Sequence, residues 1–147
     1  MNTSLAVILE RKGSAVQTVP PTLTIAETVH VMNQKKISSV VVTEGGRLAG
    51  IFTERDVLRR VIGADLDPKR TLVRDVMSSG VTTVTPATTV QEALDIFARR
   101  KCRHLPVLAE GKLAGLISVG DVSRWIGEMH RAEAEQLKEY ISGGYSA

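Results

Sequence analysis

The stretch GIFTERD at residues 50–56 returns as GLISVGD at residues 115–121. Each stretch has a glycine, two apolar residues and a hydroxyl residue, followed three positions later by an aspartate. We call these stretches the first motif and the second motif. A pattern that occurs twice in one chain raises the question of whether the surrounding sequence is repeated as well.

The sequence around the motifs is indeed repeated. Residues 16–63 align with residues 81–128 without a gap, and 15 of the 48 aligned pairs are identical. A register held over this length predicts two copies of one supersecondary unit. We expect an N-terminal flanking segment (residues 1–15) before the first repeat (16–63), and a linker (64–80) between it and the second repeat (81–128). A C-terminal helical extension (129–147) follows.

Each repeat shows the same expected order of elements. A short apolar stretch comes first, and a helix begins after it at Thr24 or Thr89, each with a glutamate three positions on, as in a capping box. Two buried strands joined by a glycine turn follow, and the motif then leads into a second helix. In the first repeat, the apolar side of that helix is expected to be Val57, Leu58 and Val61. The sequence therefore predicts an α+β fold of two β-α-β-β-α repeats.

The motifs have two interpretations. In the first, Thr53 and Ser118 cap a helix, with Asp56 and Asp121 completing two further capping boxes. This leaves the glycine unexplained, since glycine weakens a strand and often marks the close approach of a ligand or another backbone. In the second, the helix start attracts phosphate, the hydroxyl donates to it, and the carboxylate accepts two hydrogen bonds from a ribose diol. The motifs are thus either structural caps or parts of a nucleotide site.

The two repeats together resemble a tandem pair of cystathionine-β-synthase-type (CBS) domains. The resemblance covers about residues 16–128. It is carried by TVPPTLTIAETVHVM (18–32), ISSVVV (37–42) and GRLAGIFTERD (46–56), and by TVTPATTVQEALDIF (83–97), RHLPV (103–107) and GKLAGLISVGD (111–121). It implies two repeats packed about a pseudo-twofold axis, with clefts that bind adenosine-containing ligands such as AMP, ADP, ATP, S-adenosylmethionine or NAD.

The resemblance also implies roles for particular residues. Asp56 and Asp121 would hold ribose hydroxyls, and the hydroxyls of Thr53 and Ser118 would touch phosphate or ribose. The backbone of the first strands would read the adenine edge, at Thr18, Val19, Thr83 and Val84. Val40 and Leu105 would flank the adenine ring. Pro106 follows the family pattern where the first repeat has Val41, so we expect two clefts of different shape.

A basic cluster, RRKCRH, spans residues 99–104. Its first three residues are expected to be a solvated helix end, where cations complement the helix dipole. The resemblance implies that Arg103 and His104 face the phosphate of a ligand held by the first motif. Because Ser38 and Ser39 stand at the equivalent positions, we expect the first-motif cleft to be the more cationic one.

Composition excludes several classes of function. The net charge is only +3 and aromatic residues are 3%, which leaves little for stacking nucleic-acid bases. The single cysteine, Cys102, cannot form an internal disulfide, and no apolar run approaches the roughly 18 residues of a membrane span. Cys102 with His104 would make a poor zinc site, and no catalytic arrangement of side chains emerges. We expect a cytoplasmic protein with no metal, no enzymatic activity, and no binding to nucleic acid or membrane.

The sequence therefore favours a regulatory sensor that binds adenine nucleotides and forms a homodimer. Trp125, Ile126 and Met129 would either bury against a second subunit or pack within the chain. The long helix that follows the second repeat is expected to end at Gly143 and Gly144. The alternative is a module that binds a client protein through this helix, with empty or structural clefts.

Overall fold

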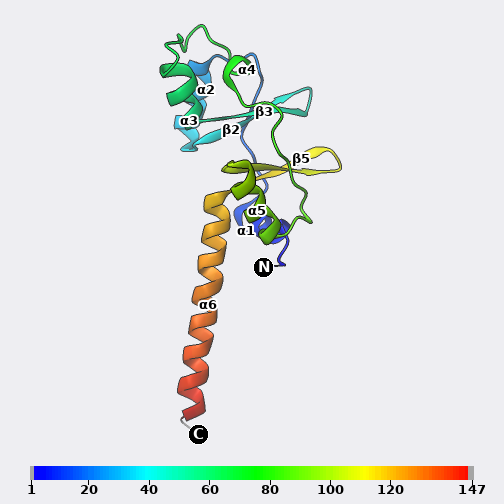
Figure 1. The fold of residues 1–147 in the computed structure, drawn as a ribbon, viewed down its shortest axis with the longest axis vertical. Helices are drawn as coiled ribbons and strands as arrows, with labels where there is room; N and C mark the ends of the chain where they lie inside the picture. The colour runs from blue at the N-terminus through cyan, green and yellow to red at the C-terminus, as the bar shows by residue number, and fades with distance from the viewer. Residues whose placement is uncertain (1, 146–147) are drawn as a thin grey trace. The chain divides into compact units, whose positions relative to one another are not determined.

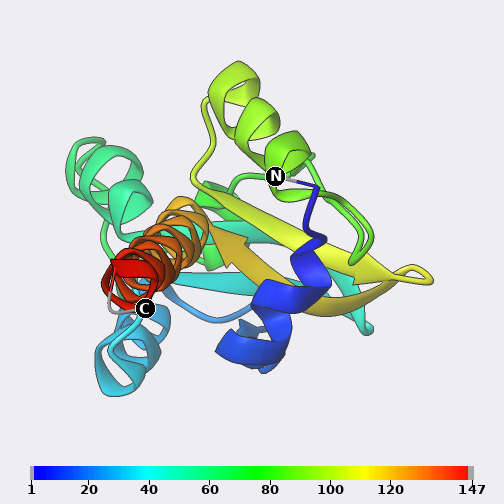
Figure 2. The same ribbon diagram turned by 90° about the horizontal axis from the view of Figure 1, so that it is seen from below.

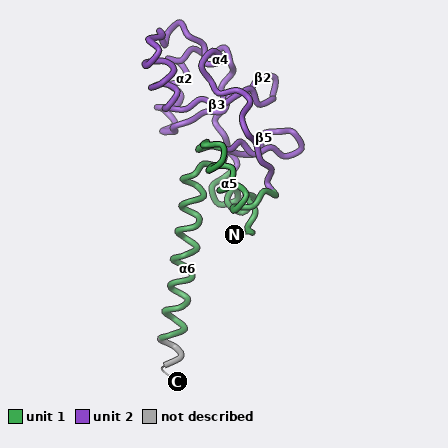
Figure 3. The backbone as a smooth tube through the Cα atoms, viewed as in Figure 1, with its two compact units in different colours: residues 1–13, 87–104, 117–147 green, residues 14–86, 105–116 purple. Residues whose placement is uncertain are grey.

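The computed structural model describes residues 2–145, with side chains up to Ile141. Figure 1 shows its elements. The chain forms two compact units, each built from separate stretches of sequence: unit 1 is residues 1–13, 87–104 and 117–147, and unit 2 is residues 14–86 and 105–116 (Figure 3). The units cut across the two sequence repeats, whose bounds stay a prediction.

Unit 2 contains a three-stranded sheet. Strand β1 (Thr18–Val19) pairs in parallel with β2 (Ser39–Glu44), and β2 pairs in antiparallel fashion with β3 (Arg47–Thr53). Helix α2 (Ile25–Lys35) connects β1 to β2. The central strand is buried on both faces, as its continuous apolar run predicts. Its fully buried residues are Val40, Val41 and Val42.

The first helix of each repeat begins where the sequence predicts. Thr24 caps α2, and both hydrogen bonds of its capping box with Glu27 are present. The hydrogen bonds from the Thr24 side chain and backbone lower the pKa of Glu27. Thr89 caps α5 (Val90–Arg100) by accepting from the Glu92 N–H. A capped start and an apolar stripe thus fix both helices.

The helix after the first motif differs from the prediction. A short α3 (Glu54–Asp56) passes directly into a π-helix, η1 (Val57–Ile62), in which the Gly63 N–H donates to the carbonyl of Leu58. Val61 is fully buried, but Leu58 is 65% exposed, so the expectation that Leu58 lies on the apolar side is wrong. The wider π turn changes which side chains face the core. The linker then returns through α4 (Val73–Val76) to the sheet.

The second repeat contributes strands β4 (His104–Ala109) and β5 (Lys112–Ser118), which form a two-stranded sheet. Their turn has Glu110 and Gly111 at positive φ. The apolar stretch expected at residues 81–84 is reduced to a single parallel bridge between Val84 and Val107.

Unit 1 holds α1 (Leu5–Lys12), α5 and the long α6 (Val119–Tyr145). The start of the chain is tied to α5, because the Leu5 N–H donates to Thr88 and the Val90 N–H donates to Thr3. Figure 2 views α6 nearly along its axis. In the part of the chain that the structure describes, no helix has the length and apolar character needed to cross a membrane.

Helix α6 continues through Gly143 and Gly144 to Tyr145, so the prediction that these glycines end it is wrong. Glycine ends a helix by adopting a left-handed conformation, which it permits but does not require. Inside a helix it costs only about 1 kcal/mol relative to alanine.

Candidate functional site

The first motif joins β3 to α3. Thr53 is the N-cap residue, with extended backbone, and its hydroxyl accepts from the Asp56 N–H at 3.4 Å. In return, Asp56 Oδ2 accepts from the Thr53 N–H at 2.9 Å and from its hydroxyl at 3.3 Å. Arg60 Nε lies 3.6 Å from Asp56 Oδ1. Both hydroxyl and carboxylate are thus held at a helix start, half-buried, as a capping box.

The glycine of the first motif has a structural cause. A Cβ on Gly50 would lie 2.6 Å from the Met77 sulfur and 2.6 Å from the Ser78 carbonyl oxygen. The linker approaches here because Ile51 and Ser78 exchange backbone hydrogen bonds of 3.0 and 2.9 Å. Another backbone therefore explains Gly50, and this glycine lends no support to a ligand site.

Gly50→Ala should destabilise the protein by about 1 to 3 kcal/mol, because the added methyl group must displace Met77 and the Ser78 backbone. Gly127→Ala is the matched control, since its Cβ meets nothing within 4 Å and lies in α6. It should stabilise the helix by up to about 1 kcal/mol. Urea unfolding of both variants measures the two changes in the free energy of unfolding. If Gly50→Ala is as stable as Gly127→Ala, the close approach of Met77 and Ser78 does not require glycine at position 50.

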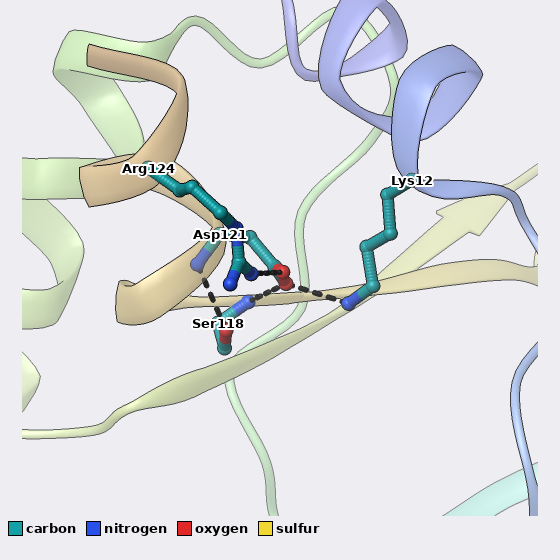
Figure 4. Close-up of polar contacts among 4 residues, drawn as sticks. All are labelled: Lys12, Ser118, Asp121 and Arg124. Atoms are coloured by element: carbon teal, nitrogen blue, oxygen red, sulfur yellow. Dashed lines mark hydrogen bonds and ion pairs between the residues drawn. The ribbon is translucent and has the colours of Figure 1, made fainter. Parts of the chain in front are cut away.

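The second motif joins β5 to α6. The Asp121 N–H donates to the Ser118 hydroxyl at 3.1 Å, and Asp121 Oδ2 accepts from the Ser118 N–H at 2.9 Å. Two cations also reach this carboxylate, as Figure 4 shows: Lys12 Nζ lies 2.5 Å from Oδ2, and an Arg124 nitrogen lies 3.0 Å from Oδ1. The Asp121 side chain is only 8% exposed, so the second motif holds a buried and paired carboxylate.

The charge state of Asp121 follows from these contacts. Burial raises the pKa of Asp121, but hydrogen bonds from Lys12 and Ser118 and the charge of Lys12 outweigh it and bring the pKa below its ordinary value. Asp121 is therefore an anion at neutral pH, and its negative charge strengthens the hydrogen bonds that it accepts.

Each motif thus brings its hydroxyl and carboxylate together. Of the other predicted site residues in unit 2, Thr18 and Val19 lie on the strand that pairs with β2, and Val40 of β2 pairs with Phe52, the neighbour of Thr53. Thr18 and Thr83 are exposed, His104 is half-buried, and Arg103 is exposed, with its carbonyl accepting from the Val119 N–H at 3.0 Å. The apolar candidates are buried: Val19, Val84, Val40 and Leu105, the last two completely. Val40 packs in the core of unit 2. The adenine-binding roles of these residues stay predictions.

Sequence reasoning missed the cations at the two motifs. Arg60 lies four positions after Asp56, and Arg124 lies three after Asp121, so helical spacing could have indicated both. Lys12 comes from 109 positions away, and no local pattern signals it. Its presence removes the basis for expecting fewer cations around the second motif, because that expectation counted only Arg103 and His104.

Cys102 and the apolar residues of α6 are the remaining candidates. Burial raises the pKa of the half-buried Cys102 thiol, which disfavours the thiolate that a metal needs. Within residues 2–145, no three His, Cys, Asp or Glu side chains gather as a metal site would require. Trp125 is buried, whereas Met129 is 37% exposed.

Comparisons with known proteins identify the family. The profile of the CBS domain family matches residues 13–63 and 73–128. A mitochondrial CBS domain-containing protein of Arabidopsis thaliana is 39% identical over 127 residues, which are 83% of this chain and 62% of that protein. This chain thus spans less than two thirds of that relative's length.

Solved structures agree in fold. A CBS-domain containing protein of Agrobacterium tumefaciens is 36% identical, with a TM-score of 0.78 over 83% of this chain and 98% of that one. A CBS domain protein of Pyrobaculum aerophilum, solved in complex with AMP, is 25% identical, with a TM-score of 0.71 over 80% of this chain and 88% of that one. The chain therefore belongs to the CBS domain family and carries two copies of that domain in tandem.

Proposed function

We propose that this protein is a regulatory sensor that binds adenosine nucleotides through its two motifs and signals by a change in conformation or oligomeric state. The observation that carries this proposal is the repeated placement of a hydroxyl and a carboxylate at a helix start, at Thr53 and Asp56 and again at Ser118 and Asp121. The AMP complex of the Pyrobaculum relative supports it.

The chemistry of the first motif suits a ribonucleotide. Asp56 Oδ1 has Arg60 at 3.6 Å, beyond a hydrogen-bond distance, so this oxygen keeps acceptor capacity for the O–H groups of a ribose diol. The N–H groups of Glu54 and Asp56 already donate to the Ser38 carbonyl and the Thr53 hydroxyl, so it is the positive end of the helix dipole that favours an anionic phosphate here. AMP, ADP, ATP and NAD all carry these groups, and they are the proposed ligands.

Thermal unfolding in the presence of these ligands tests the proposal. A ligand at about 100 times its Kd should add about 2.7 kcal/mol, which raises the Tm of a chain of this size by about 5 to 10 °C. S-adenosylmethionine, which lacks phosphate, belongs in the same series. If none of these compounds moves the Tm, and calorimetry detects no heat of binding, the nucleotide-sensor proposal is wrong.

Two further parts of the proposal rest on the family resemblance. We propose a homodimer, which light scattering would show as about twice the chain mass of 15.9 kDa and would refute by a monomer mass at micromolar concentration. We also propose a role in the cytoplasm without catalysis, which localisation of a tagged full-length protein would test.

An alternative function is a module that binds a client protein. It is favoured by the exposed apolar side chains of α6, at Leu137, Tyr140 and Ile141, which are 59%, 78% and 48% exposed. Their spacing places them on neighbouring turns of the helix, as in a helix that docks in a groove. Under this alternative the chain binds no adenosine ligand, so the same thermal experiment separates the two functions.

A further inference from the structure

The carboxylate of Asp121 is nearly saturated with donors from its own chain. Oδ2 accepts from Lys12 Nζ at 2.5 Å and from the Ser118 N–H at 2.9 Å, while Oδ1 accepts from Arg124 at 3.0 Å (Figure 4). A carboxylate offers about four acceptor positions. Three of them are therefore in use, and the one that remains is on Oδ1.

A ribose diol needs two of these positions. If its two O–H groups bridge the carboxylate, one fills the open position on Oδ1 and the other needs a position on Oδ2. The donors to Oδ2 are the Ser118 N–H, which belongs to the helix cap, and Lys12. Since the backbone donor is fixed by the cap, Lys12 is the group that must leave.

Lys12 is well placed to hold this position and to give it up. It lies in the last turn of α1, where a cation is favoured, and it meets Asp121 in the first turn of α6, where an anion is favoured. Arg11 and Glu128 form a second ion pair between the same helices at 3.3 Å. The Lys12 side chain is one third exposed, so water is within reach when it swings away.

The first motif has no equivalent donor within the described residues. Both hydrogen bonds to the Asp56 carboxylate come from Thr53 and fall on Oδ2, while Arg60 stands 3.6 Å from Oδ1. A diol can therefore approach Asp56 without displacing a hydrogen-bonded cation. The two motifs have the same sequence pattern but differ in the occupancy of their carboxylates.

We propose that Lys12 is an internal competitor of ribose at the second motif, so that a ribonucleoside binds there only when Lys12 releases Asp121. The proposal rests on the proposed function, since it assumes that the motif carboxylates bind ribose. It makes the first motif the site that fills first and the N-terminal helix the element that controls the second.

The test uses the full chain carrying Asp56→Ala, which leaves Asp121 as the intact motif carboxylate. Calorimetry measures the Kd of adenosine, which presents the diol without phosphate, before and after the further change Lys12→Met. Methionine keeps much of the apolar stem and removes the charge. We expect adenosine to bind about tenfold or more tightly after this change, as loss of a competing charge-assisted hydrogen bond implies.

Two matched controls isolate the competition. Arg11→Met breaks the exposed pair with Glu128 without touching Asp121, and it should change the Kd by less than about fivefold. 2′-Deoxyadenosine lacks the diol, so its Kd should not respond to Lys12→Met. Circular dichroism confirms that each variant is folded.

The outcomes separate this inference from the proposed function. If adenosine affinity is unchanged or weaker in Lys12→Met while the wild-type chain binds adenosine at the first motif, the competition is wrong and the nucleotide sensor stands. If 2′-deoxyadenosine gains as much affinity as adenosine, Lys12 does not compete with the diol and the inference is overturned. If neither adenosine nor AMP binds to any variant or to the wild type, both proposals fail.

Discussion

Asp56→Ala should weaken the binding of AMP by about 100-fold. A diol that donates two hydrogen bonds to a carboxylate makes charge-assisted contacts worth about 1.5 to 3 kcal/mol each, and their loss together is expected to cost about 3 kcal/mol. The loss should appear in the total AMP affinity, because the second motif, where Lys12 pairs with Asp121, contributes little to AMP binding in the wild type. Isothermal calorimetry of the two proteins measures it directly.

The matched control for this prediction is Asp121→Ala, which removes the same side chain from the other motif and should leave the AMP affinity within a fewfold of the wild type. Asp56→Ala should lose only the capping contribution to stability, about 1 kcal/mol, so the protein stays folded. Unchanged AMP affinity in Asp56→Ala would mean that the first motif is a helix cap and nothing more.

The fold was predictable where local signals and burial agree. Thr24 with Glu27 and Thr89 with Glu92 mark the starts of α2 and α5, and both helices begin there. The apolar run of β2 predicts a strand buried on both faces, and it is one. The order of helices and paired strands was readable because the capped helix starts and the apolar periods agree, although the first strand of the second repeat is reduced to a bridge between Val84 and Val107.

The π-helix could not be read from the repeat. Arg59 aligns with Arg124, and both stand three residues after their aspartate, yet Asp56 is met by Arg60 and Asp121 by Arg124. The π turn of η1 follows directly on the first motif, whereas α6 continues as an α-helix, which accounts for the shift of one position. Aligned residues in the two repeats therefore have different neighbours.

Contacts between segments far apart in the chain could not be predicted from the sequence either. Gly50 is required by Met77 and Ser78, which lie in the linker, and a strand glycine alone does not say whether a backbone or a ligand approaches it. Lys12 lies in the predicted N-terminal flanking segment, yet it supplies the shortest contact to Asp121. Such pairings depend on tertiary packing, which no local pattern encodes.

Asp121→Ala should destabilise the protein by about 2 to 4 kcal/mol, more than Asp56→Ala. The variant loses the helix cap with Ser118, at about 1 kcal/mol, and it loses the hydrogen bonds to Lys12 and Arg124, which contribute the rest. Arg124 is 68% exposed and can return to water, so most of the charge contribution comes from Lys12. Urea unfolding at pH 7 measures the difference between the two variants.

The pH dependence of this stability difference tests its electrostatic part. Because the pKa of Asp121 in the folded protein is lowered, its ionised form contributes stability that is complete above the unfolded-state pKa of about 3.9 and is lost as the pH falls through the lower, folded-state value. The gap between wild type and Asp121→Ala should therefore be constant from pH 7 to about pH 5 and should narrow below pH 4. Lys12→Met removes a hydrogen bond and a charge that lower the pKa of Asp121, so the folded-state and unfolded-state pKa values lie closer together and the gap should narrow by a smaller amount in that background. A gap that stays constant down to pH 3 would show that Asp121 stabilises the protein by packing alone, and that its ion pair with Lys12 contributes nothing to the fold.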